Sequence, residues 1–278
     1  MDKLSVPLQD VDVGIIYETC VNSYRDEKKK KRLFGYKEEI EEEAKKYKGS
    51  VSEILKNCKT SYDEHRKEIA SVYTDKFAKS SFIKGYMYYS SIKNNVYKNR
   101  CPICEIGMPE TLDHYLPKEK YPLLSITPAN LVPQCFHCNH SKHSYAGDTL
   151  EKMLPHPYFD DLSKEVWLKA TLLFDEGIVA TYSNGYKGTD MLFTSRTSLL
   201  LAEYQLCELY GIHAASYLSG HIGSWKMILA EAGEPQLKAH LEREKKNTEI
   251  SNVNGWEAAL NRALNVQFSE LVSFLEAK

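Results

Sequence analysis

The sequence predicts a mainly helical α+β protein with a compact module inserted between helical N- and C-terminal regions. Helical periodicity dominates both ends of the 278-residue chain. That periodicity vanishes between residue 99 and about residue 144, where six prolines and short apolar segments replace it. Two Cys-x-x-Cys pairs frame the same stretch. We therefore expect a helical region at 1–98, a compact module at 99–145, and a C-terminal region at 146–278 in which a short hairpin precedes helices.

The N-terminal region has the start and stop signals of successive helices. Apolar residues at helical spacing predict a helix over Lys37–Lys48, which Gly49 ends. The pattern Ser50-x-x-Glu53 predicts a capping box that opens the next helix, and Ser61-x-x-Glu64 predicts another. Ser80 or Ser81 is the expected cap of a later helix.

The C-terminal region combines one hairpin with a long helical stretch. Alternating apolar residues predict strands at 166–174 and 177–182, joined by a turn that contains Gly177. Helical periodicity then begins near Ser198 and continues to the end. We expect it to be broken at four places: Gly211, Gly220–Gly223, Gly233–Pro235 and Asn252–Gly255.

Composition and charge narrow the classes of protein. Apolar residues make up 42% and charged residues 27% of the chain, which is typical of a globular protein. The N-terminus lacks the pattern of a signal peptide, and no apolar run is long enough to span a bilayer, so we expect a cytoplasmic protein without membrane contact. The net charge is only −2, but residues 76–143 hold nine basic and four acidic side chains, a local field suited to a phosphate-bearing partner.

The cysteines indicate a metal site rather than disulfides. Seven cysteines in a chain without an export signal argue against a disulfide framework. Cys101 and Cys104 form one Cys-x-x-Cys pair, and Cys135 and Cys138 form the other. Each such turn directs two thiolates toward one point, so two turns together supply the four ligands of a structural Zn²⁺. The alternative is four buried cysteines without metal.

The residues between the cysteine pairs match a known pattern. Asp113 and His114 precede the loop that contains Asn130, and Asn139 and Lys142 follow the last cysteine. This arrangement resembles the HNH (ββα-metal) endonuclease family in its zinc-stabilised form. The resemblance covers roughly residues 99–145 and implies a ββα fold with a metal-dependent nuclease site.

The resemblance and the chemistry together assign roles to these residues. Hydrolysis of a phosphodiester needs a deprotonated water and a cation that offsets transition-state charge, and histidine is a suitable base near neutral pH. The family pattern implies that His114 is this base and that Asp113 and Asn139 hold the cation. It also implies that Asn130 pins the loop and orients the histidine. Oxygen ligands favour Mg²⁺ (or Mn²⁺) at this centre.

Other assignments stay open at the level of sequence. Many family members carry histidine where Asn139 stands, so His140 and His143 are rival ligands. The alternative for Asp113-His114 is a turn or strand-end pair with ordinary hydrogen bonds. In that case, the module would be a non-catalytic zinc-stabilised module that binds nucleic acid or protein.

Partners follow from the charges and from the flanking regions. Arg100, Lys118 and Lys142 flank the predicted centre and are candidate phosphate contacts, with DNA expected ahead of RNA. The flanks, including the stretch at 156–160, loosely resemble HNH nucleases of bacterial anti-phage systems that work beside an ATPase. That resemblance implies an ATPase partner and a role in defence.

Overall fold

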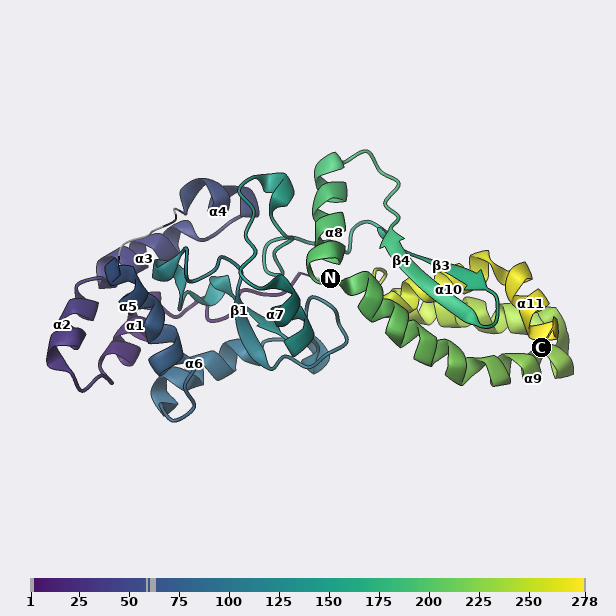
Figure 1. The fold of residues 1–278 in the computed structure, drawn as a ribbon, viewed down its shortest axis with the longest axis horizontal. Coiled ribbons are helices and arrows are strands. Elements are labelled where there is room, and N and C mark those ends of the chain that lie inside the picture. The colour runs from purple at the N-terminus through teal and green to yellow at the C-terminus, as the bar shows by residue number, and fades with distance from the viewer. Residues whose placement is uncertain (1–2, 59, 61–63, 278) are drawn as a thin grey trace. The chain divides into compact units, whose positions relative to one another are not determined.

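The computed structural model describes residues 3–58, 60 and 64–277, and these form two compact units (Figure 1). One unit spans Lys3–Asp160, and we call it the N-terminal unit. The other begins at Asp161, and we call it the C-terminal unit. The described residues are mainly helical, with one two-stranded antiparallel sheet in each unit. The predicted mainly helical α+β class is therefore confirmed. No helix in the described ranges has the length and hydrophobicity needed to cross a bilayer.

The N-terminal unit places a small hairpin and a short helix beside a group of helices. The strands β1 (Thr111–His114) and β2 (Leu131–Gln134) pair antiparallel, with His114 opposite Leu131. A short helix, α7 (Phe136–Lys142), follows β2 directly. Among the described residues, the other α-helices of this unit are α1 (Val13–Val21), α2 (Glu27–Phe34), α3 (Lys37–Lys46), α4 (Val51–Asn57), α5 (Glu64–Val72) and α6 (Ile83–Lys93).

Helix caps decide where several of these helices begin. The predicted capping box is confirmed: the Ser50 hydroxyl accepts the Glu53 amide at 3.3 Å, and the Glu53 carboxylate accepts the Ser50 amide at 2.9 Å. The prediction for Ser61 lies outside the described residues. The expected serine cap of α6 is wrong, because Phe82 precedes this helix without a side-chain capping bond.

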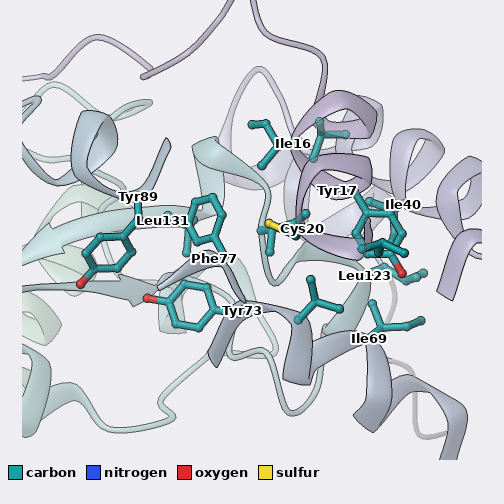
Figure 2. Close-up of a cluster of buried hydrophobic side chains, with 14 of the residues drawn as sticks. Ile16, Tyr17, Cys20, Ile40, Ile69, Tyr73, Phe77, Tyr89, Leu123 and Leu131 are labelled. Atoms are coloured by element: carbon teal, nitrogen blue, oxygen red, sulfur yellow. The ribbon is translucent and has the colours of Figure 1, made fainter. Parts of the chain in front are cut away.

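A shared apolar core joins the helices to the hairpin (Figure 2). Ile16, Tyr17 and Cys20 on α1 are fully buried within it. Leu131 of β2 belongs to the same cluster, so the core continues to the back of the sheet. Figure 2 shows Tyr73 at the sheet end of the cluster, with its hydroxyl pointing away from the aliphatic side chains. The helices therefore form a fixed support for the hairpin.

The segment at 153–160, which follows α7, is hydrogen-bonded to the hairpin and to the loop after β1. The Tyr158 hydroxyl donates to the Leu131 carbonyl at 2.8 Å, and the Tyr115 hydroxyl donates to the Leu154 carbonyl. His156 is fully buried between them: its Nδ1 accepts the Tyr158 amide, so Nε2 carries hydrogen and donates to the Tyr47 oxygen at 3.0 Å. The His-Pro-Tyr-Phe-Asp stretch is thus a structural part of the N-terminal unit.

The C-terminal unit packs a hairpin against helices. The predicted strands are confirmed as β3 (Leu168–Phe174) and β4 (Ile178–Asn184), which pair antiparallel with Phe174 opposite Ile178. Alternate residues of both strands are buried, as expected for a sheet with one covered face. The hairpin packs on two helices, α9 (Leu206–Ser251) and α10 (Trp256–Val266) (Figure 1). The unit also contains α8 (Met191–Glu203) and α11 (Phe268–Ala277).

The predicted helix breaks are only partly correct. Gly211 and Gly220–Gly223 lie inside α9, so the breaks expected there are wrong. Single glycines cost a helix only about 1 kcal/mol each, and burial of apolar side chains along α9 outweighs that amount. The break at Gly233 is confirmed, because this residue has φ +78° ahead of Pro235. The break at Asn252–Gly255 is also confirmed, between α9 and α10.

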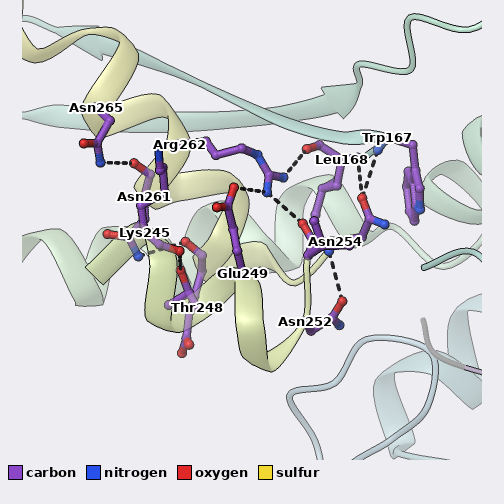
Figure 3. A network of polar contacts seen from close by, with 12 residues as sticks. Trp167, Leu168, Lys245, Thr248, Glu249, Asn252, Asn254, Asn261, Arg262 and Asn265 are labelled. Carbon is purple, nitrogen blue, oxygen red and sulfur yellow. Dashed lines mark hydrogen bonds and ion pairs between the residues drawn. The ribbon is translucent and has the colours of Figure 1, made fainter. Parts of the chain in front are cut away.

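Side chains satisfy the outer edge of β3 in place of a third strand (Figure 3). Asn254 accepts the Trp167 amide at 2.9 Å and the Leu168 amide at 3.3 Å, and Arg262 donates to the Leu168 carbonyl at 2.9 Å. Gln267 binds both backbone groups of Leu172 through its own amide. An edge with occupied donors and acceptors is protected from pairing with another chain.

Asn254→Ala should destabilise the C-terminal unit by about 3 kcal/mol. The buried Asn254 side chain also donates to the carbonyls of Leu162 and Glu165, so its loss leaves four backbone groups without their partner. Urea denaturation followed by circular dichroism measures the change. Asn265→Ala, which removes two half-buried bonds, should cost about 1 kcal/mol, and equal effects of the two variants would contradict this account.

Candidate metal centre and active site

The four predicted zinc ligands converge on one buried point. The thiols of Cys101, Cys104, Cys135 and Cys138 all lie within 4.8 Å of one another, and none is in a disulfide. The sulfurs of Cys104 and Cys135 are 3.7 Å apart. Tetrahedral zinc with Zn–S bonds of about 2.3 Å separates its sulfurs by about 3.8 Å, so the cluster can hold such an ion.

Tight backbone turns bring the two cysteine pairs together. In the first turn, the Glu105 amide donates to the Cys101 carbonyl at 2.8 Å, and the Cys101 amide donates to the Gly107 carbonyl at 2.7 Å. A Cβ atom on Gly107 would lie 2.7 Å from the Cβ atom of Cys135, which is too close for any other residue. The second pair spans the first turn of α7, with Cys135 at its N-cap. The cluster thus joins the segment before β1 to the helix after β2.

A cavity of 700 Å³ opens beside the hairpin and contains the predicted catalytic residues. Asp113, His114 and Asn139 all line it, although Asp113 and His114 are neighbours on one strand. Neighbouring side chains of a regular strand point to opposite faces, but His114 is the last residue of β1, where the pairing ends. Its other lining residues are Tyr73, Ala78, Tyr89, Thr111, Leu112, Pro117, Lys118, Glu119, His143 and Ser144.

His114 is held as a neutral imidazole of one tautomer. Its Nε2 lies 2.8 Å from the Ser125 carbonyl oxygen, which can only accept, so Nε2 carries the hydrogen. Nδ1 therefore keeps a lone pair, and it has no hydrogen-bond partner among the residues that the structure describes. Burial lowers the pKa of His114 to about 3. The Tyr73 ring packs against the imidazole in an edge-on contact, with 4.4 Å between the ring centroids.

Asp113 is a buried carboxylate with two donors on one oxygen. The Lys142 ammonium lies 2.9 Å from its Oδ2, and the Gln134 amide donates to the same oxygen at 3.2 Å. Burial raises the pKa of Asp113, while the Lys142 charge acts in the opposite direction. Oδ1 is the oxygen that Lys142 and Gln134 leave available.

Asn139 and Asn130 have different surroundings. Asn139 lies on α7, and its Nδ2 donates to the Thr111 hydroxyl on β1 at 3.1 Å, which leaves its amide oxygen for another ligand. Asn130 is fully buried and does not line the cavity. Its amide instead bonds the Leu116 amide and carbonyl and the Leu124 carbonyl. Asn130 therefore fixes the loop between β1 and β2, which contains the Ser125 carbonyl that orients His114.

The three predicted phosphate contacts lie in different environments. Lys118 lines the cavity and pairs with Glu119 at 2.9 Å. Arg100 is exposed and donates to the Glu105 carbonyl at 3.2 Å. A phosphate contact by Lys142 would need an exposed ammonium, and the structure instead buries this side chain, leaving it 1% exposed. The structure thus gives Lys142 partners within the protein, at Asp113 and the His114 carbonyl.

The rival ligands differ in position from Asn139. His143 lines the cavity. His140 is exposed and is not among the lining residues, and its ring stacks on the Phe136 ring with 5.6 Å between the ring centroids.

The sequence pattern does not single out every residue of the site. Tyr73 and Thr111 also line the cavity, and Gln134 and Ser125 hydrogen-bond the side chains of Asp113 and His114. Tyr73 carries only the signal of a core helix position. Gln134 acts through its side-chain amide on Asp113, and Ser125 acts through its backbone carbonyl on His114. No sequence pattern indicates either contact.

The donor chemistry of the cavity fits a hard divalent cation. Asp113 and Asn139 would supply one carboxylate oxygen and one amide oxygen from opposite sides, β1 and α7. Mg²⁺ and Mn²⁺ prefer such oxygen ligands and keep several waters, so two protein ligands suffice. The thiols, which prefer zinc, are gathered in the separate cysteine cluster.

Comparisons with known proteins give one partial similarity. Over 79 residues, the chain is 37% identical to the protein ea31 of Escherichia phage lambda. The match covers 27% of this chain and 26% of ea31, so the chain spans about a quarter of that relative's length. No family model matches the sequence, and no solved structure matches the fold.

One zinc ion per chain is the expected result of elemental analysis on the purified protein. Cys135→Ala should lose this zinc and lower the melting temperature of the N-terminal unit, because the metal would link the segment before β1 to α7. Cys207→Ala is the matched control, since this half-buried thiol lies in α9 outside the cluster, and it should keep the zinc. Retention of full zinc by Cys135→Ala would refute the assignment.

His114 should stay neutral across the physiological range. With a folded pKa of about 3, its ring signals in NMR should not titrate between pH 5 and 8 in magnesium-free buffer. The unfolded chain binds a proton below about pH 6.5, so stability falls as the pH decreases through that value. At pH 5.5 this penalty is about 1.4 kcal/mol, and His114→Gln should remove it. A ring that titrates near pH 6.5 would contradict this assignment.

Proposed function

We propose that the protein is a metal-dependent endonuclease of the HNH type that hydrolyses phosphodiester bonds in DNA. The main support for the proposal is that Asp113, His114 and Asn139 line the same cavity. It supports the proposal because these three residues are those that the family pattern implies, and because their atoms combine a proton acceptor with two oxygen ligands. The cysteine cluster and the neighbouring basic side chains are consistent with such a module.

His114 is the proposed general base. Its Nε2–H donates to the Ser125 carbonyl, so Nδ1 is the atom that would accept a proton from water. The resulting hydroxide oxygen forms a bond to phosphorus as the bond between phosphorus and the leaving oxygen breaks, and solvent water protonates that oxygen. Burial favours the neutral ring that a base requires. The negative charge of a bound phosphate would stabilise the imidazolium that forms.

The other residues would bind and orient. Asp113 and Asn139 would hold Mg²⁺, which when bound would offset charge on the phosphate oxygens. Tyr73 packs against the imidazole and limits its rotation, and Asn130 fixes the loop behind it. Lys118 lines the cavity and would contact phosphate, which positions nucleic acid without selecting a sequence.

The partner hypothesis also remains a proposal. The lining residues of the cavity all come from the N-terminal unit, so the C-terminal unit contributes no residue to the proposed chemistry. An ATPase partner and a role in anti-phage defence rest on the loose resemblance of the flanks. Affinity purification from the native host that yields the chain alone, in fully active form, would count against both.

A plasmid-nicking assay tests the proposed activity. The wild-type protein with Mg²⁺ should nick supercoiled DNA, and EDTA should stop the reaction without removing the buried zinc. His114→Ala should slow the reaction by about 10²-fold or more, the usual contribution of a general base. His240→Ala, a histidine of α9 in the other unit, should leave the rate unchanged.

Two outcomes would refute the proposal. Nicking by His114→Ala at the wild-type rate would exclude this residue as the base. A zinc-loaded wild-type protein that binds DNA but never cleaves it would favour the non-catalytic binding module instead.

A further inference from the structure

Lys142 occupies a position that the proposed chemistry does not use. Its side chain is 1% exposed, and its ammonium lies between the Asp113 carboxylate at 2.9 Å and the His114 carbonyl at 2.8 Å. Asp113 is itself only 9% exposed. Burial costs the ammonium its hydration, and only such close contacts offset that cost. The Lys142 ammonium is therefore fixed in this position.

The same contacts determine how Asp113 can act. Lys142 and Gln134 both approach Oδ2, at 2.9 Å and 3.2 Å, from α7 and β2. A carboxylate that uses one oxygen in this way can offer only the other to a metal ion. Asn139 lies one helical turn before Lys142, at i and i+3, so both side chains face β1. The helix thus places the proposed metal ligand Asn139 beside the cavity and the Lys142 ammonium on Asp113.

We propose that Lys142 is a positioning residue, the resident counter-ion of Asp113, and that it makes tight binding of a divalent cation depend on a nucleic-acid phosphate. This inference rests on the proposed function. Asp113 and Lys142 together carry no net charge, and Asn139 is neutral. Lys118 and Glu119, which also line the cavity, pair with each other at 2.9 Å and cancel likewise.

Electrostatics connects this neutrality to cation affinity. Affinity for Mg²⁺ or Mn²⁺ grows with the negative charge of the ligands, and here a fixed cation cancels the single carboxylate. A phosphate that enters the cavity would add the missing negative charge and a further oxygen ligand. By linkage, phosphate and cation then increase each other's affinity by the same factor. The site would stay weakly occupied until nucleic acid is present.

Manganese binding tests this role without any measurement of cleavage. Full-length, zinc-loaded protein is titrated with Mn²⁺, and electron paramagnetic resonance reports the free ion. Lys142→Gln keeps a hydrogen-bond donor but removes the charge, so it should bind Mn²⁺ at least about tenfold more tightly. Lys142→Arg should stay close to wild type. Lys46→Gln, which removes a lysine from an ion pair with Glu43 outside the cavity, should change nothing.

The direction of the change separates the two possible roles of Lys142. A lysine that only supports the fold would, on removal, weaken Mn²⁺ binding or leave it unaltered. Either result in a Lys142→Gln protein with full zinc content and native circular dichroism overturns the proposal.

A second measurement covers the case in which Lys142→Gln does not fold. His114→Gln protein, in which hydrolysis should be slow, is titrated with Mn²⁺ with and without a short DNA duplex. The duplex should tighten Mn²⁺ binding by at least about tenfold, and equal affinities would overturn the proposal. If Mn²⁺ does not bind the protein with the duplex or without it, the metal site of the proposed function is also refuted. If Mn²⁺ binds with the same affinity with and without the duplex, only the proposed role of Lys142 is refuted.

Discussion

The convergence of four buried thiols is the constraint on which the rest of the candidate site depends. The cysteine pairs lie on either side of the hairpin in the sequence, yet their sulfurs gather within 4.8 Å. This cluster sets the position of α7 relative to β1, and residues of both elements line the cavity. Asp113 and Asn139 can act on one ligand only if that spacing is maintained. A metal ion in the cluster would therefore stabilise the site as well as the fold.

Around this cross-link, the protein holds each proposed catalytic group through a partner of fixed geometry. A backbone carbonyl selects the tautomer of His114, an ammonium and an amide select one oxygen of Asp113, and a hydroxyl orients Asn139. Asn130 and the 153–160 segment fix the loop and strand behind them. Preorganisation of this kind reduces the rearrangement needed when a substrate binds.

Local signals in the sequence predict much of this structure. The spacing of Cys101, Cys104, Cys135 and Cys138 predicts the cluster, because two Cys-x-x-Cys turns together supply the four ligands of a structural zinc site. The capping box at Ser50 and the alternation of β3 are equally local. The breaks expected at Gly211 and Gly220–Gly223 do not occur, because packing along α9 outweighs the local preference of glycine. The burial of Lys142 could not be predicted either, since it depends on how α7 packs against β1.

The most direct test of the central claim is to locate a divalent cation in the protein bound to DNA. Crystals of His114→Gln protein with a DNA duplex and Mn²⁺ would reveal the ion by anomalous scattering. A manganese peak is expected in the cavity, in contact with Oδ1 of Asp113, the Asn139 amide oxygen and a phosphate of the duplex. A duplex bound elsewhere on the protein, with no manganese beside Asp113, would contradict it.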